Sequence, residues 1–541
     1  MSIMNKTIAL IISLLCALSG GCSFSHGSDM FRNGVLSPSD APELEITEAS
    51  PKDLGDTNPI ISNVFCADPT SVEYEGRLYI YGTCDEQQFE ETGTAGENSY
   101  EKIKSLVMLS TDDMKNFTYH GRINVGEIAP WIVASWAPSV VSRKESDGLT
   151  HFYMYFSNSG WGTGVLTSTS PTGPWSDPLG KSLIDGHTKG LKGCKVPFDP
   201  GAVIDDDGVG WLTFGGCGGG ENGRIVRLGA DLISLDSEIT KLPCQYHFEA
   251  NELNFINGTY VYTYNTDWQS HIPDWDTTVK GAPPPVCSMV YMTTKTPLDY
   301  DSWEYRDCYF KNPGEQGMEY GNNHTHLQKF GGRYYLFYHA MLNQKEFGTT
   351  GGFRNICVNE AVVDENTLSI EKVNGDRKGT EQIKPLDPFE PVEAETMAAC
   401  SGIDYHRSDD GMSIASEGDA AGWTYVCGAD FGKGTSYIGV TAKGKGIIEV
   451  HEGSPEGERI AAIKIDSSDH KFFCTDMELK GSHDISFVIQ KGVEFDSWSA
   501  APTGTMAAPT GTVAAPTGTV AAPTGTVAAP TGTMIAPAGS R

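Results

Sequence analysis

The 541-residue chain carries 70 acidic and 39 basic side chains, a formal net charge of −31. This balance argues against a protein that binds nucleic acid or anionic membranes, because such proteins need clustered positive charge. A hydrophobic content of 39% with 10% aromatic residues supports a packed core and excludes a mostly disordered chain. The length suggests about three or four domains, and the 62 glycines and 29 prolines indicate many turns and hence β structure.

The first 22 residues have the pattern of an export signal. One positively charged side chain, Lys6, precedes an apolar run from Ile8 to Leu18, and small residues follow up to Cys22. The run is too short to span a bilayer, which needs about 20 residues, so we predict a cleaved signal peptide over residues 1–22. The residues before Cys22 resemble a bacterial lipoprotein signal, in which this cysteine is acylated. We therefore expect an exported protein, lipid-anchored at Cys22 or secreted, with a linker over residues 23–53.

The other end of the chain is repetitive. Residues 500–534 are five copies of Ala-Ala-Pro-Thr-Gly-Thr followed by Met or Val, and no charged residue lies between Asp496 and Arg541. Such a segment cannot bury enough apolar surface to offset its ordering entropy. We predict a disordered tail over residues 500–541.

The 13 cysteines include no Cys-x-x-Cys pair that would indicate zinc or redox chemistry. Their number after Cys22 is odd, so at least one thiol stays free within a single chain. Some disulfides are expected in an exported protein, although the sequence does not assign them.

Between the two ends, a hairpin pattern recurs five times. Each copy has a turn glycine followed by a short strand of alternating aromatic and aliphatic residues, which is typical of the second strand of a hairpin. Repeating units of about 50–75 residues predict an all-β fold with a five-bladed β-propeller over residues 54–387. The turn glycines are Gly76, Gly148, Gly208, Gly258 and Gly332.

The strand before the turn begins with a polar residue in four of the copies. Inner strands of propeller blades run along the central axis, so we expect these four side chains to meet in one cavity. Three carboxyl groups around one axis form a costly like-charge cluster, which favours a functional role over a structural one. The four residues, eight or nine positions before their glycines, are Asp68, Asp199, Glu249 and His324.

Each of these features also has a simpler explanation. Asp-Pro pairs often open turns, and residues 205–208 fit a hairpin turn better than a calcium loop. His324, His326 and His339 could suggest zinc, but their spacing is not convincing for a ligand set. The matched offsets of the acidic residues favour the functional explanation.

The ordered set of motifs resembles glycoside hydrolase family 43, whose members are five-bladed β-propellers with a pocket on the axis. The resemblance implies that Asp68 is the general base, that Asp199 orients the acid and sets its pKa, and that Glu249 is the general acid. The matching stretches are Cys66-Ala67-Asp68-Pro69, Trp136-Ala137-Pro138, Ser170-Pro171-Thr172-Gly173-Pro174-Trp175, Phe198-Asp199-Pro200, Phe248-Glu249-Ala250, Gly321-Asn322-Asn323-His324 and Gly352-Phe353-Arg354.

The same resemblance implies that Trp136, Arg354 and His324 contribute to substrate binding, with His324 beside a central calcium or its waters. The alternative roles are a core aromatic for Trp136 and an ion pair between blades for Arg354. Inverting hydrolysis needs a carboxylate that activates water and a carboxylic acid opposite it, about 6.5–9.5 Å apart. A second carboxylate beside the acid raises its pKa and keeps it protonated.

Residues 389–499 have the length and strand pattern of a β-sandwich of about 100 residues. The stretches Val-Glu-Ala-Glu, Asp-Phe-Gly and Gly-Ser-His-Asp resemble carbohydrate-binding module family 6. Residues 468–471 read Ser-Asp-His-Lys where that family has Gly-Gly-Trp, which leaves open whether this module binds sugar. The resemblance also implies a candidate structural calcium site at Glu393, Glu395 and Asp496.

The sequence therefore predicts an inverting glycoside hydrolase that removes arabinofuranosyl groups from arabinoxylan, an α-L-arabinofuranosidase. A β-xylosidase or arabinanase of the same family is the first alternative, and a sugar-binding propeller without catalysis is an alternative of another class. A protein-interaction propeller ranks last, because WD and kelch signatures are missing. The expected partner is plant cell-wall polysaccharide (arabinoxylan, xylan or arabinan), with no nucleic acid and a membrane only through the lipid anchor. The chemistry requires no cofactor, and calcium is the candidate ion.

Overall fold

The computed structural model describes residues 38–47, 50–218, 222–275, 278–279, 281–408 and 411–503. The predicted signal peptide, the acylated Cys22 and the tail from residue 504 onward lie outside the described residues and stay predictions. Within the described ranges, no helix has the length and apolar character needed to cross a membrane.

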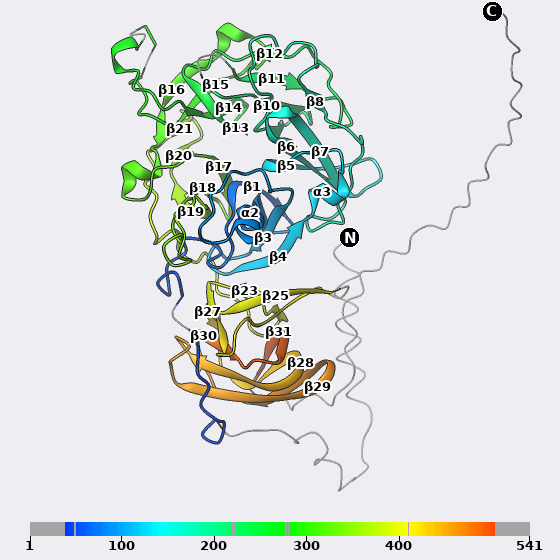
Figure 1. Ribbon diagram of the computed structural model, residues 1–541, viewed down its shortest axis with the longest axis vertical. Coiled ribbons are helices and arrows are strands. Elements are labelled where there is room, and N and C mark those ends of the chain that lie inside the picture. The colour runs from blue at the N-terminus through cyan, green and yellow to red at the C-terminus, as the bar shows by residue number, and fades with distance from the viewer. Residues whose placement is uncertain are drawn as a thin grey trace, which may run out of the picture. The chain divides into compact units, whose positions relative to one another are not determined.

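Five antiparallel sheets follow one another along the chain as the blades of a propeller (Figure 1). This arrangement confirms the predicted all-β, five-bladed fold. The first blade is β1 (Ala67–Tyr74), β2 (Arg77–Thr83), β3 (Leu106–Thr111) and β4 (Phe117–Ile123), and the second is β5 (Trp136–Lys144), β6 (Thr150–Ser157), β7 (Gly162–Ser168) and β8 (Ile184–Asp185). The third is β9 (Gly201–Ile204), β10 (Gly210–Phe214), β11 (Arg224–Arg227) and β12 (Thr240–Lys241). The fourth is β13 (His247–Ile256), β14 (Thr259–Thr266), β15 (Met289–Thr294) and β16 (Glu304–Phe310), and the fifth is β17 (Thr325–Phe330), β18 (Arg333–Ala340) and β19 (Asn355–Ala361).

Helices and short strands occupy the connections. A further strand pair follows the fifth blade, and α2 follows β2 on the way to β3. These elements are α2 (Asp85–Thr92), α3 (Val125–Ile128), β20 (Val363–Asp364), β21 (Ser369–Ile370) and four 3₁₀ turns at Ser159–Trp161, Ile272–Asp274, Tyr300–Ser302 and Pro313–Gln316.

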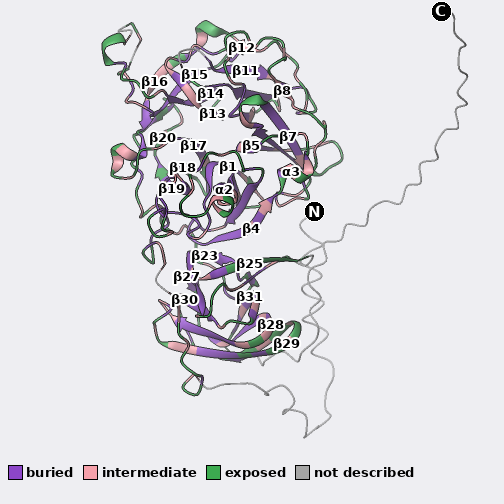
Figure 2. Ribbon diagram, viewed as in Figure 1, coloured by how far each residue is buried: buried purple, intermediate pink, exposed green. Residues whose placement is uncertain are grey.

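The five turn glycines adopt the backbone conformation that the sequence pattern predicts. All five have φ between +73° and +87°, the left-handed region that glycine enters without a steric penalty. Each one connects the innermost strand of a blade to the second strand, as predicted. The second strands are almost entirely buried (Figure 2), because their two faces pack against neighbouring blades.

The propeller ring closes through its own N-terminal segment. Residues 57–66 run along β19 of the fifth blade, where the backbone N–H of Ile60 donates to the carbonyl of Ile356 at 3.0 Å. Asn58 extends this contact, since its side chain exchanges two hydrogen bonds with the backbone of Val358. At the end of the segment, the N–H of Cys66 donates to the carbonyl of Arg354 at 2.8 Å. The start of the first blade is thereby fixed against the last.

The strands after the propeller form a β-sandwich-like module. One sheet has the order β24-β27-β30-β28-β31-β26-β25, with β22 paired to β31 and β29 paired to β28. Its apolar core includes Phe487, Phe495 and Trp498. The strands are β22 (Val392–Glu393), β23 (Thr396–Met397), β24 (Ala399–Ser401), β25 (Ile403–Ser408), β26 (Gly411–Ser416), β27 (Gly422–Asp430), β28 (Thr435–Glu452), β29 (Arg459–Asp476), β30 (Ser482–Ile489) and β31 (Val493–Pro502).

The ends of this module differ from the sequence-based boundaries. β31 continues to Pro502, three residues beyond the predicted end at residue 499, because Ala500 and Ala501 pair with β28. Part of the predicted linker also packs on the module, where Ile46 bridges to Ala421 and lies against an apolar cluster.

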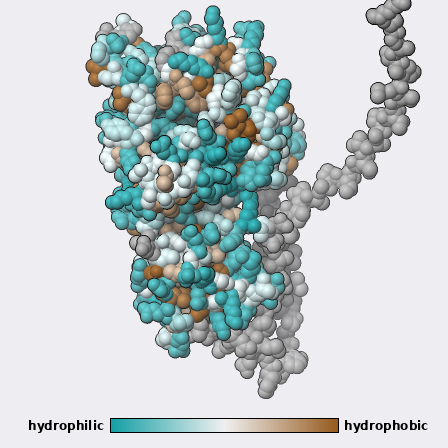
Figure 3. All heavy atoms as spheres, viewed as in Figure 1, coloured by the Kyte–Doolittle hydropathy of each residue, from teal (hydrophilic) through white to brown (hydrophobic). Residues whose placement is uncertain are grey.

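The module is joined to the first blade by hydrogen bonds. β23 pairs with β4 and becomes a fifth strand of that blade. Nearby, the side chain of Asn116 donates to the carbonyl of Cys427 at 2.9 Å and accepts its N–H at 2.8 Å. The visible surface is mainly hydrophilic, with hydrophobic residues in small separate patches (Figure 3).

All eleven described cysteines are free thiols, so the expected disulfides are not found in this part of the chain. Eight of them are buried. Buried thiols behave as small apolar side chains, which explains how a cysteine-rich propeller packs without cross-links.

Candidate active site

Four blades begin their inner strand with the same backbone conformation. A non-glycine residue there has a positive φ, namely Asp68 (50°), Ala137 (39°), Asp199 (50°) and Ala250 (59°). In the first, second and fourth blades the strand pairing also shifts register at this point, as in a β-bulge. Bulges redirect side chains, and a left-handed non-glycine residue costs about 1–3 kcal/mol. Two of the strained positions are predicted pocket residues and the other two directly follow the predicted Trp136 and Glu249, which indicates that the surrounding structure enforces them.

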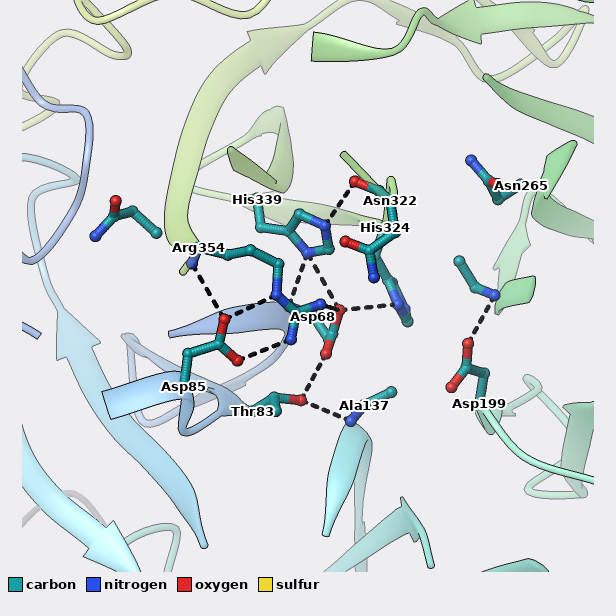
Figure 4. Close-up of polar contacts among 12 residues, drawn as sticks. Asp68, Thr83, Asp85, Ala137, Asp199, Asn265, Asn322, His324, His339 and Arg354 are labelled. Atoms are coloured by element: carbon teal, nitrogen blue, oxygen red, sulfur yellow. Dashed lines mark hydrogen bonds and ion pairs between the residues drawn. The ribbon is translucent and has the colours of Figure 1, made fainter. Parts of the chain in front are cut away.

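Asp68 lies in a dense network of polar contacts (Figure 4). Its Oδ2 accepts a hydrogen bond from Thr83 Oγ1 at 2.7 Å, and its Oδ1 lies 3.0 Å from Arg354 Nη1 and 3.5 Å from His324 Nδ1. Its backbone N–H donates to His339 Nδ1 at 3.2 Å. Burial alone would raise the pKa of Asp68, but the Arg354 guanidinium holds that pKa well below its usual range. This carboxyl is therefore ionised at neutral pH.

Arg354 is itself held by a second carboxylate, Asp85 at the start of α2. Arg354 Nε and Nη2 each lie 2.8 Å from an Asp85 oxygen, and the Arg354 backbone N–H donates to the same group at 3.1 Å. The ring of Tyr100 covers the guanidinium at 4.9 Å. Arg354 thus forms an ion pair between the fifth and first blades, which is one of the two roles that the sequence suggested. The same guanidinium also contacts Asp68.

Asp199 lies beside the backbone of the fourth blade. Its Oδ2 accepts the N–H of Ala250 at 2.9 Å, and its own N–H donates to Ser157 Oγ at 2.8 Å. Burial, together with the negative charge of Asp68, raises the pKa of Asp199 to about 7. Ala250 directly follows Glu249 in the chain, so Asp199 is hydrogen-bonded next to the predicted acid.

The pKa of Glu249 shifts in the opposite direction to the pKa of Asp68. Burial raises the pKa of Glu249 well above its usual value, and the charges of Asp199 and Asp68 raise it further. Arg354 and a hydrogen bond from the Asn322 side chain oppose this rise. The three predicted acids therefore interact electrostatically in one site, where the pKa of Asp68 is lowered and the pKa of Glu249 is raised well above its usual value.

The remaining predicted pocket residues lie next to this cluster. The indole N–H of Trp136 donates to the Tyr100 carbonyl at 3.0 Å, and the two rings meet edge to face with centroids 6.0 Å apart. Trp136 is partly exposed and packs against an apolar cluster of the first and fifth blades. His324 is buried, and burial lowers its pKa to about 4, which keeps its ring neutral at neutral pH.

No group of three or more His, Cys, Asp and Glu side chains among the described residues is arranged to hold a metal ion. His326, one of the three histidines considered for zinc, pairs with Glu252 at 2.6 Å and with Ser71 Oγ at 2.8 Å instead. The zinc hypothesis therefore has no support in the described structure.

The candidate calcium residues of the module do influence one another. Burial raises the pKa of Glu395 well above its usual value, and the charges of Glu393 and Asp496 add to this effect. Glu395 Oε2 is buried without a hydrogen-bond partner. The nearby cation Arg77 donates to other groups, namely Ser110, Asp112 and Thr118.

Several pocket residues were missed at the sequence level. Asp85 and Tyr100 belong to no repeated motif, and Thr83 ends a strand chosen only for its hydrophobic pattern. Asn322 lies inside a family-like stretch in which the sequence assigns a role only to His324, and the sequence suggests His339 only as a zinc ligand. Only contacts between distant segments identify these five residues.

Three carboxyl groups with pKa values shifted in opposite directions, at the ends of inner propeller strands, indicate a hydrolase that cleaves glycosides or polysaccharides. The comparisons with known proteins agree. The model of glycosyl hydrolases family 43 matches residues 56–365. The arabinoxylan arabinofuranohydrolase of Bacillus subtilis (strain 168) is 33% identical over 453 residues, 77% of this chain and 85% of that protein.

A second relative, the arabinoxylan arabinofuranohydrolase of Paenibacillus polymyxa, is 32% identical over 445 residues, 76% of this chain and 68% of that protein. The crystal structure of a family 43 arabinoxylan arabinofuranohydrolase from Bacillus subtilis in complex with cellotetraose superposes with a TM-score of 0.77 at 31% identity. That match covers 84% of this chain and 99% of the other. The chain belongs to glycosyl hydrolases family 43, and it is a glycoside hydrolase.

The raised pKa of Glu249 predicts a pH-dependent stability penalty. An unfolded Glu249 ionises near 4.5, whereas the folded protein keeps it protonated to higher pH. The free energy of unfolding therefore falls as pH rises above about 4.5. We expect Glu249→Gln to have a higher Tm than the wild type at pH 8, with a much smaller difference at pH 5, in thermal unfolding followed by circular dichroism.

The exposed Glu417 provides the control, because Glu417→Gln removes a carboxyl without changing the pocket. A Glu249→Gln difference that is independent of pH would contradict the electrostatic explanation.

Proposed function

We propose that this enzyme is an inverting α-L-arabinofuranosidase that removes arabinofuranosyl groups from arabinoxylan. The observation that carries the proposal is the meeting of Asp68, Asp199 and Glu249 in one site, where the pKa of Asp68 is lowered and the pKa of Glu249 is raised. Inverting hydrolysis requires this combination of base and acid. The names of the two curated relatives support arabinoxylan as the substrate.

Asp68 is the general base in this mechanism. Its carboxylate takes a proton from water while that water attacks the anomeric carbon from the face opposite the leaving group. Thr83 and Arg354 fix the orientation of the carboxylate through both of its oxygens. Arg354 also keeps this group ionised, so that it enters each cycle able to accept a proton.

Glu249 is the general acid, and Asp199 controls its protonation. Glu249 gives its proton to the glycosidic oxygen as the bond to the sugar breaks. The charge of Asp199 keeps the proton on Glu249 until that step. The reaction needs only these side chains and water, so no cofactor takes part in it.

Trp136 and His324 are the residues that we assign to sugar contact. The partly exposed Trp136 ring can stack on the apolar face of a sugar, and the neutral His324 can bind a hydroxyl group. Arg354 acts mainly through Asp68, because its guanidinium donates its hydrogen bonds to the carboxylates of Asp68 and Asp85.

The same geometry suits a β-xylosidase or an arabinanase, which remain the alternatives within the family. Comparing the hydrolysis of a chromogenic arabinofuranoside, a chromogenic xyloside and linear arabinan under one set of conditions tests the substrate assignment. Catalysis mainly on the xyloside or on arabinan would overturn it.

The acid–base assignment makes a prediction about leaving groups. We expect Glu249→Ala to lose about 10²- to 10⁴-fold in kcat on glycosides with poor leaving groups, and far less on aryl glycosides that leave without protonation. The wild-type product, followed by NMR, should appear with inverted anomeric configuration. Equal losses on all leaving groups, or retained configuration, would remove the proposed mechanism.

Exposed aromatic residues at the pocket end of the propeller support a polymeric substrate. Trp161 is 69% exposed and lies four residues after Ser157, which contacts Asp199. Trp268 is 44% exposed and lies three residues after Asn265, which pairs with Glu249 across the strands. Four residues reach at most about 14 Å, so both indoles stay near the pocket.

Trp161→Ala and Trp268→Ala should therefore weaken binding of arabinoxylan. Partial burial of an indole contributes about 1–2 kcal/mol, so we expect KM for arabinoxylan to rise about 5- to 30-fold while kcat/KM on a chromogenic arabinofuranoside stays unchanged. The matched control is Leu149→Ala, an exposed residue in the turn at the other end of the second blade. Equal effects on both substrates would contradict a role in holding the polymer.

We also propose that calcium binds the module at Glu393, Glu395 and Asp496, whose carboxylates are not arranged as a ligand set in this structure and would have to move together to hold the ion. The orphaned, buried Glu395 Oε2 supports this, because a hard cation with oxygen ligands would satisfy it. The ion would neutralise like charges and stabilise the fold without taking part in catalysis.

Binding to the folded state alone raises stability, so calcium should raise Tm, and a chelator should lower it. Glu395→Gln should abolish this response in differential scanning calorimetry. An unchanged wild-type Tm across calcium concentrations would exclude the site.

A further inference from the structure

Hydrogen bonds join the inner strands of neighbouring blades around the propeller axis. An inner strand is the edge of its sheet, so some of its backbone N–H groups have no partner within the blade. In the described part of the chain, each blade donates such an N–H to a side chain of the preceding blade, and the series closes from the first blade back to the fifth. We call these contacts the axial belt. Its accepting side chains, in chain order, are Thr70 (3.2 Å), Ser139 (2.9 Å), Asp199 (2.9 Å), Glu252 (3.1 Å) and His326 (3.0 Å).

The belt passes from the fourth blade to the first through two buried side chains that contact each other. Both oxygens of Glu252 in β13 lie 3.1 Å from the N–H of Leu327 in β17, and Glu252 Oε1 also lies 2.6 Å from His326 Nδ1. His326 Nε2 accepts the N–H of Ser71 in β1, so this nitrogen carries no proton and the ring donates its Nδ1 proton to Glu252. The pair therefore connects β13, β17 and β1.

Two of these strands carry the proposed base and acid. Asp68 lies three residues before Ser71 in β1, and Glu249 lies three residues before Glu252 in β13. In both strands, the pairing with the second strand of the blade shifts register at or directly after the carboxyl residue. Such a bulge disrupts the ladder, so pairing within the blade does not by itself fix the carboxyl. The belt holds each strand just beyond its bulge.

We propose that His326 and Glu252 are positioning residues that fix the separation between the general base and the general acid. This inference rests on the roles proposed for Asp68 and Glu249. Inverting hydrolysis needs the two carboxyls about 6.5–9.5 Å apart, and a misplacement of about 1 Å can cost about 10²-fold in rate. His326 and Glu252 act through the backbones of the two strands that bear these carboxyls.

The test uses His326→Phe, which keeps a ring in this position but removes both nitrogen atoms. We expect kcat to fall about 10- to 100-fold while KM changes less than about 2-fold, because the connection matters for the transition state more than for sugar binding. The measurement is steady-state kinetics on aryl glycosides of the sugar that the wild type releases. The loss should be similar for poor and good leaving groups, because attack by water needs the base with either one.

Two further variants test the pair itself. His326→Gln offers an oxygen that can accept the Ser71 N–H, so we expect it to restore part of the rate lost in His326→Phe. Glu252→Met removes both carboxylate oxygens and should lower kcat to a similar extent. Because both changes break the same connection, the double variant His326→Phe/Glu252→Met should lose little more than either single variant.

Ser139→Ala is the matched control. It removes the belt contact between the second and third blades, which carry neither the base nor the acid. Thermal unfolding should show a lowered Tm for both Ser139→Ala and His326→Phe, whereas only His326→Phe should lower kcat. An equal loss of kcat in the two variants would overturn the inference, because any break in the belt would then have the same effect.

Asp68→Ala and Glu249→Ala, measured in parallel, separate this inference from the proposed function. If both lose activity while His326→Phe keeps the kcat of the wild type, the inference alone is overturned. If Asp68→Ala or Glu249→Ala keeps the kcat of the wild type on poor leaving groups, the proposed function is overturned and the inference with it.

Discussion

The Arg354 guanidinium gives Asp68 a different pKa shift from those of Asp199 and Glu249. Burial raises the pKa of Asp68, Asp199 and Glu249 alike. Only Asp68 receives a direct contact from Arg354, and only its pKa falls. The negative charge of the ionised Asp68 then raises the pKa values of Asp199 and Glu249. A single buried cation thus determines which carboxyl can accept a proton and which can donate one.

The position of this cation depends on the closure of the ring. Arg354 precedes the last strand of the fifth blade, whereas Asp68 and Asp85 belong to the first. Their backbones are joined by the hydrogen bond from Cys66 to the Arg354 carbonyl, two residues before Asp68. Closing the propeller and assembling the ion pair are therefore one structural event, which is why strained φ values can persist at the strand starts.

The module contributes to the same blade from the outside. β23 adds a strand to the edge of the first blade. The Asn116 side chain of that blade hydrogen-bonds to Cys427 in β27 of the module. Covering a sheet edge in this way removes unpaired backbone groups that would otherwise invite association. Phe472 is the large aromatic residue that stands most open on the described part of the module, at 47% exposure. The covered edge gives the module a structural role that does not depend on sugar binding.

Local patterns in the sequence were sufficient for the blades and for the polar residues at their heads. A turn glycine followed by alternating aromatic residues defines a hairpin through backbone sterics alone, and five hairpins in order define the propeller. Asp68, Asp199, Glu249 and His324 could be found because each stands at a fixed distance from its own turn. Trp136 and Arg354 came from the family resemblance.

Asp85, Tyr100, Thr83, Asn322 and His339 could not be found in this way. Each owes its role to a neighbour far away in the chain, as Asp85 does to Arg354, and nothing in its local sequence marks that neighbour. The same holds for protonation, because a pKa depends on burial and on charges brought together by folding. The chain alone therefore determined its hairpins and the acids at their heads, whereas the tertiary structure decided which acid is ionised and which residues hold it, since both follow from distances that exist only after the ring has closed.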